Sequence, residues 1–137
     1  MRPLALALAV GALAVAGCAG DDDESEDGSA KGSPEATGRA TVDMNDRLTF
    51  EPKKIEVSVG EKVTWKNVGK VGHTVTADKS KAADPSLVSI PAGTKGWDSG
   101  LVNEAQSFSR TFDRRGTYRY VCIPHEGAGM VGTVVVG

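Results

Sequence analysis

Hydrophobic and polar residues alternate along most of the chain after position 38, with a period of two residues. In such a pattern one face of a strand is buried and the other meets solvent. The predicted strands are Lys54–Gly60, Lys62–Asn67, His73–Asp78, Ser107–Phe112, Thr117–Cys122 and Val131–Val136, with Arg39–Met44 as a weaker first strand. Seven or so short strands in about 100 residues predict an all-β, antiparallel β-sandwich.

One long segment, Lys79–Gly100, interrupts this pattern. It contains proline and glycine and is long for a plain loop. We expect a short helical turn around Lys81–Val88. An amphipathic helix of usual length is not predicted anywhere.

The N-terminus has a different pattern. Arg2 is followed by the continuous apolar and small-residue run Leu4–Gly17, which is typical of a secretory signal peptide. Its 14 residues are too few for a membrane-spanning helix, which needs about 20. The run ends in VAGC, which resembles a lipobox. We therefore expect residues 1–17 to be a lipoprotein signal peptide and Cys18 to be lipidated. An ordinary signal peptide cut nearby is the alternative.

Residues 18–38 are predicted to be a disordered acidic linker after the lipidated cysteine. Positions 19–38 hold seven acidic residues, one lysine and no large apolar residue, so they cannot bury enough surface to offset their ordering entropy. Residues 39–137 form the predicted domain. They carry 14 Lys and Arg against 11 Asp and Glu, a balance of +3, although the whole chain is at −2. A charge of +3 suits an acidic partner or anionic headgroups but is too weak to predict nucleic-acid binding.

The candidate chemistry lies between the last two predicted strands. The chain has only two cysteines, two histidines and three methionines, and Cys122, His125 and Met130 fall within nine residues. Thiolate, imidazole and thioether donors suit copper and do not suit Ca²⁺ or Mg²⁺. The only other histidine is His73, which would complete a set of two His, one Cys and a weak Met. That set is typical of a blue-copper electron-transfer site.

Each residue also has a simpler interpretation. Taken alone, His73 is more typical of a surface histidine and Met130 of core packing. Cys122 and Cys18 could form a disulfide in an oxidising compartment, and zinc would favour a closed set of Cys and His without a thioether. The four residues together favour copper.

Two segments carry a family resemblance. Gly116–Val136, GTYRYVCIPHEGAGMVGTVVV, resembles the copper loop and flanking strands of plastocyanin. Phe50–Val75 resembles the segment that leads to the first copper histidine of that family. With its lipoprotein signal, the chain is most similar to bacterial and archaeal plastocyanin-like proteins, including the halocyanins. Val121 and Thr74 depart from the family, which usually has Tyr and Asn there.

The resemblance implies a Greek-key cupredoxin sandwich of seven to eight strands that holds one type 1 copper ion, cycling between Cu(I) and Cu(II). His73, Cys122, His125 and Met130 fall on its four ligand positions. Cys122 is expected to give the oxidised form its blue colour, and Met130 to be the long axial donor. His73 should be buried, with its second ring nitrogen bonded to a backbone carbonyl. His125 should be the electron port, in an apolar patch that Leu101 extends.

The function predicted first is a membrane-anchored electron carrier on the extracytoplasmic face of the membrane. A copper-delivery or buffering protein is the alternative. We predict no enzyme activity, because copper oxidases and nitrite reductases need further histidines and none is spare. The expected partners are redox proteins, namely a cytochrome, an oxidase, a reductase or a photosystem component, and the chain is expected to be a monomer.

Overall fold

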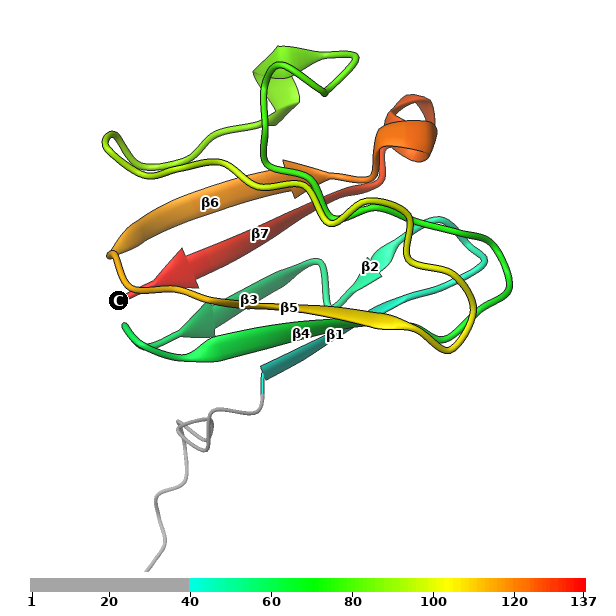
Figure 1. Cartoon of the computed structure of the whole chain (residues 1–137), viewed down its shortest axis with the longest axis horizontal. Helices are drawn as coiled ribbons and strands as arrows, with labels where there is room; N and C mark the ends of the chain where they lie inside the picture. Colours follow the sequence, from blue (N-terminus) through cyan, green and yellow to red (C-terminus); the bar gives the residue numbers. More distant parts are fainter. Residues whose placement is uncertain (1–39) are drawn as a thin grey trace, which may run out of the picture. The chain divides into compact units, whose positions relative to one another are not determined.

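The computed structural model of the chain describes residues 40–137, and the regular secondary structure of this region consists mainly of strands, joined by long connections (Figure 1). The predicted signal peptide 1–17, the lipidation site Cys18 and the predicted linker 18–38 lie outside the described residues. The strands are β1 (Ala40–Met44), β2 (Phe50–Glu51), β3 (Lys54–Val57), β4 (Lys62–Asn67), β5 (Ser107–Thr111), β6 (Gly116–Val121) and β7 (Val131–Val136). Two short 3₁₀ helices, η3 (Pro85–Leu87) and η4 (Ile123–Ala128), lie in the connections. No helix within residues 40–137 has the length and apolar character to cross a membrane.

The strands form two sheets, which confirms the predicted sandwich. One sheet has the order β2-β1-β4-β5 and the other β3-β7-β6. Both are mixed, so the expectation of a purely antiparallel sandwich is wrong: β1 pairs with β4 in parallel, and β3 pairs with β7 in parallel. Alternation shows which side chains face the core, but it does not show in which direction neighbouring strands run.

The core between the sheets is rich in aromatic rings. Trp65 on β4 and Tyr120 on β6 are fully buried and meet edge to face, with ring centroids 5.3 Å apart. Phe50 packs against Tyr120 at 4.7 Å in the same geometry. Gly132 on β7 makes room for the Tyr120 ring, because a Cβ at that position would overlap the ring. Such packing stiffens the end of β6 just before Cys122.

The predicted strand His73–Asp78 is not a continuous strand. His73 makes an isolated bridge with Val102, while Thr76 makes bridges with both Asp98 and Val121. The side chains from His73 to Ala77 are all buried, so this segment does not have one buried and one exposed face as a strand at the surface of a sheet would. Its hydrogen bonds therefore go to several elements in turn.

The predicted helical turn around Lys81–Val88 is confirmed as η3. Asp84 caps it by accepting a hydrogen bond from the Ser86 N–H, and Pro85 begins it. After η3, the backbones of Ser89 and Arg119 exchange two hydrogen bonds, so this connection lies beside β6.

Candidate metal centre

Cys122, His125 and Met130 lie on one closed loop between β6 and β7, at one end of that hairpin (Figure 1). The loop is closed by a hydrogen bond of 3.1 Å from the Cys122 N–H to the Met130 carbonyl. Within it, the His125 N–H donates to the Cys122 carbonyl and the Met130 N–H to the His125 carbonyl. Gly129 takes a left-handed conformation, with φ of 79°, which favours glycine and allows the chain to turn back into β7.

His73 reaches the same place from a distant part of the chain. Its N–H and carbonyl both bond to Val102, at 3.1 and 2.7 Å. The segment that precedes His73 is fixed by Asn67, at the end of β4. The buried side-chain amide of Asn67 donates hydrogen bonds to the Val71 and Val102 carbonyls at 2.7 and 3.0 Å. The Asp46 carboxylate binds the Lys70 and Val71 N–H groups of the same turn. His73 is therefore fixed by long-range contacts.

Three donor atoms converge here. One ligand atom each from His73, Cys122 and His125 lie within 4.8 Å of one another. The Cys122 Sγ is 3.2 Å from the His125 Nδ1 and 3.7 Å from the His73 Nδ1. The two imidazole rings meet at 64°, with centroids 5.1 Å apart. Both Nδ1 atoms thus face the sulfur.

Met130 completes the arrangement. It is 1% exposed and is joined by backbone hydrogen bonds to both Cys122 and His125. The four predicted residues therefore form an arrangement like a type 1 copper site. Within the described part of the chain Cys122 is a free cysteine.

The electrostatics of the site fit a cation. Burial lowers the pKa of His73, and the nearby His125 lowers it further, which favours the neutral imidazole that a metal requires. Burial raises the pKa of the Cys122 thiol. A thiolate at that buried position gains from a bound cation, which offsets its desolvation. The donor set, two imidazoles with one thiol sulfur and a thioether, fits copper.

The burial predicted for His73 is confirmed, since the residue is fully buried. The carbonyl expected to bind its second ring nitrogen is not found among the described residues: the Nε2 is buried and has no hydrogen-bond partner there. The backbone of Asn45 faces the ring and acts to raise the pKa of His73, but the approach falls outside hydrogen-bond geometry. His125 is half-buried, and Leu101 is 59% exposed beside Gly72.

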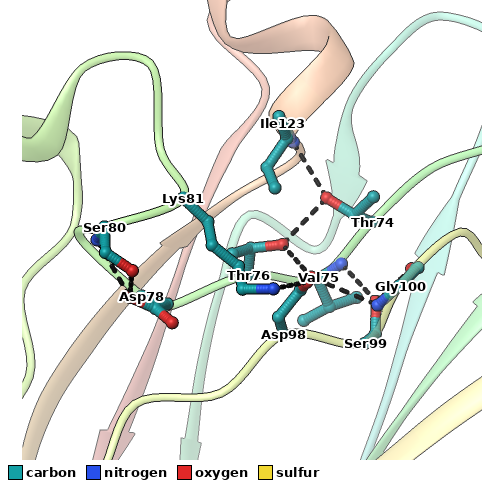
Figure 2. A network of polar contacts seen from close by, with 10 residues as sticks. All are labelled: Thr74, Val75, Thr76, Asp78, Ser80, Lys81, Asp98, Ser99, Gly100 and Ile123. Atoms are coloured by element: carbon teal, nitrogen blue, oxygen red, sulfur yellow. Dashed lines mark hydrogen bonds and ion pairs between the residues drawn. The ribbon is translucent and has the colours of Figure 1, made fainter.

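Sequence reasoning missed two attachments of the loop. The Glu126 carboxylate accepts hydrogen bonds from the Ala83 and Asp84 N–H groups at 2.8 and 2.9 Å. On the other side, the Thr74 hydroxyl accepts a hydrogen bond from the Ile123 N–H (Figure 2). The Thr74 N–H itself points to the Cys122 Sγ at 3.3 Å. The departure of Thr74 from the family pattern was the one signal for the Thr74 contacts, and no signal in the sequence indicated those of Glu126.

A two-sheet β-sandwich with this set of donors at one end defines the cupredoxin class of copper proteins. The chain belongs to the plastocyanin/azurin family of copper-binding proteins, which it matches over residues 36–137.

Relatives and solved structures agree with this assignment. Plastocyanin from Solanum crispum is 38% identical over 93 residues, which cover 65% of this chain and 88% of that protein. The chloroplastic plastocyanin of Pisum sativum is also 38% identical over 93 residues, but they span only about half, 52%, of the pea protein. A Cu(I) structure of an amicyanin variant has a TM-score of 0.57 at 30% identity, covering 74% of this chain and 84% of that one. Oxidised plastocyanin from Dryopteris crassirhizoma has a TM-score of 0.55 at 31% identity, covering 72% and 100%.

Proposed function

We propose that this protein is a mononuclear blue copper electron carrier. The observation that carries the proposal is the convergence of two imidazole nitrogens on a buried thiol at the end of a stiff sandwich. His73 and His125 would bind copper through Nδ1, Cys122 through its thiolate and Met130 more weakly through its thioether. The bound copper supplies one-electron chemistry by cycling between Cu(I) and Cu(II).

The protein's part is to keep these donors in place in both oxidation states. The His73 segment is bound to Val102 and the 122–130 loop is closed on itself, so neither has to rearrange. Cys122 and Met130, at the two ends of the loop, are both buried. Their burial restricts the access of water and competing ligands to the metal site. In this function the protein transfers electrons between other proteins and does not turn over a substrate.

His125 is the proposed electron port. It is half-buried, whereas its neighbours Pro124 and Gly127–Gly129 are exposed and uncharged. Leu101, which packs beside Gly72, would extend this uncharged surface. Such a surface suits a brief, weak encounter with a redox partner, at the low end of interface size. A cytochrome, an oxidase, a reductase or a photosystem component fits this description.

Colour tests the proposal. The purified protein loaded with Cu(II) should show an intense blue absorption, which should bleach with a one-electron reductant and return on reoxidation. Colourless protein that binds only Cu(I) and gives it up readily would instead support copper delivery or buffering. Zinc binding with no copper colour would contradict both functions.

We further propose that the domain is tethered to the extracytoplasmic face of the membrane through a lipid on Cys18. The support is the sequence VAGC after an apolar run, followed by an acidic segment. Cys18→Ser should move the protein from the detergent phase to the aqueous phase while the copper spectrum stays the same. Equal partitioning of the variant and the unaltered protein would contradict the anchor.

A further inference from the structure

Thr74 connects the two segments that carry the proposed ligands. It directly follows His73, and its hydroxyl oxygen accepts a hydrogen bond of 2.9 Å from Ile123, which directly follows Cys122. Its own N–H lies 3.3 Å from the Cys122 Sγ. The two segments are 49 residues apart in sequence, and this side chain joins them next to the ligands, beyond the backbone hydrogen bonds that Thr76 and Val121 exchange.

The Thr74 hydroxyl is itself held by a second threonine. The Thr76 Oγ1 lies 2.9 Å from the Thr74 Oγ1 and 2.9 Å from the Asp98 Oδ1 (Figure 2). A hydroxyl has one proton to donate, and an ionised carboxylate can only accept. The Thr76 hydroxyl is the donor in both contacts, so its one proton is shared between the Thr74 Oγ1 and the Asp98 Oδ1, and the Thr74 oxygen also accepts from the Ile123 N–H.

Asp98 anchors this chain of hydrogen bonds at the surface. Although burial acts to raise its pKa, hydrogen bonds from the Gly100 N–H, the Thr76 hydroxyl and Lys81 leave the pKa below its usual value. The Lys81 Nζ is 3.2 Å from the Asp98 Oδ2, and the two side chains are 52% and 20% exposed. The neighbouring Ser99 fixes the backbone, because Val75 and Ser99 exchange hydrogen bonds.

We propose that Thr76, Asp98 and Lys81 form a positioning relay for the copper site. The relay holds the Thr74 hydroxyl through the hydrogen bond from Thr76, so that one residue bonds both the Cys122 sulfur and the Ile123 backbone. Thr76 and Thr74 are buried, whereas the ion pair is partly exposed, so the relay connects the copper thiolate to a surface charge pair. This inference rests on the proposed function for its copper readout, but the hydrogen-bond geometry is independent of it.

Two measurements on the full-length protein test the relay. The first is hydrogen exchange of the Ile123 amide in the metal-free protein. The second is the midpoint potential of the copper-loaded protein. Thr74→Val keeps the shape of the side chain and removes its hydroxyl, whereas Thr74→Ser keeps the hydroxyl. Thr76→Val removes the hydroxyl that bonds to Thr74 and so interrupts the relay next to Thr74. Thr64→Val is the matched control, because it removes a similar threonine–serine hydroxyl bond of 2.8 Å between β4 and β5.

In Thr74→Val, Ile123 exchange should accelerate at least tenfold. The ratio of oxidised to reduced copper at a fixed potential should change at least twofold, about 18 mV on the one-electron scale of about 59 mV per tenfold. Thr76→Val should shift the potential in the same direction by a smaller amount. Thr74→Ser should return both readouts to their original values, and Thr64→Val should move neither.

The proposal is overturned if Thr74→Val leaves the potential unchanged, if Thr64→Val moves it equally, or if Thr74→Ser behaves like Thr74→Val. If Thr74→Val does not fold, Thr76→Val and Thr74→Ser give the same decision. Failure of the unaltered protein to bind copper would refute the proposed function alone, because Ile123 exchange in the metal-free protein still shows whether the relay holds the loop.

Discussion

The two histidines of the site are held by opposite kinds of structure. His125 lies in a nine-residue loop that is closed by backbone hydrogen bonds between Cys122, His125 and Met130. His73 lies in a segment without a continuous strand, and its backbone bonds go to Val102. His125 is half-buried, whereas His73 is fully buried. A local loop thus presents one ligand near the surface, while long-range packing fixes the other inside.

The largest effect is expected where the two segments meet. The Cys122 sulfur lies beside the Thr74 N–H from one segment and the His125 ring from the other. Cys122→Ser should abolish the blue absorption, because a hydroxyl cannot supply the sulfur charge-transfer transition. Absorption spectra after copper loading measure this. Cys18→Ser, at the other cysteine of the chain, is the control and should keep the band at full intensity.

The histidines themselves can be compared by removing each ring. His125→Gly should open a gap near the surface that added imidazole enters, so the blue band should return as imidazole is titrated. His73→Gly should not recover in the same way, because His73 is 0% exposed and added imidazole has no open path to its site. The comparison fails if both variants recover at the same imidazole concentration.

A smaller change is expected at the end of the loop. Met130→Gln should keep the blue colour but lower the midpoint potential by roughly 60 mV, about a tenfold change in the redox equilibrium. The reason is that an amide oxygen is a stronger axial donor than a thioether and favours the oxidised state. Met44→Leu, a conservative change at a buried methionine in β1, should leave the potential unchanged. A rise in potential in Met130→Gln would show that Met130 is not the axial ligand.

The smallest effect should come from the outer attachment of the loop. Glu126→Ala removes the acceptor of the Ala83 and Asp84 N–H groups. We expect a loss of about 1 kcal/mol, since these hydrogen bonds are charge-assisted but partly solvated. That corresponds to a fall of about 4–8 °C in the melting temperature of the metal-free domain. Thermal unfolding measures it, with Glu104→Ala on an exposed turn as the control. An unchanged melting temperature would show that this contact does not hold the loop.

The same contrast explains what could be predicted from the sequence. The spacing C-x2-H-x4-M is contiguous, so Cys122, His125 and Met130 could be assigned to one loop, and the alternation in β4 and β7 gave those strands. His73 was added to the set because it is the only other histidine and because Phe50–Val75 resembles the segment that leads to the first copper histidine of the family. The strand predicted for His73–Asp78 was wrong, since the side chains from His73 to Ala77 are all buried and the backbone partners change from residue to residue.

Hydrogen bonds between residues that are far apart in the sequence could not be predicted. The Thr74–Ile123 bond spans 49 residues and the Glu126–Ala83 bond spans 43, and neither pair has a pattern in the sequence that links its two members. The direction of strand pairing was missed for a similar reason. The parallel pairs β1–β4 and β3–β7 depend on how the chain crosses between the sheets, which alternation does not encode.

The place of β7 has a consequence for the order of events during folding. This last strand lies between β3 and β6, with Lys54 paired to Thr133 across a long stretch of chain. Pairings so far apart in sequence are slow to form, because the chain must close a large loop before the contact is gained. A growing chain that ends before residue 131 lacks the middle strand of this sheet and cannot close its ligand loop. We therefore expect metal capture to wait until β7 has docked between β3 and β6, so that copper is not bound before this sheet has closed.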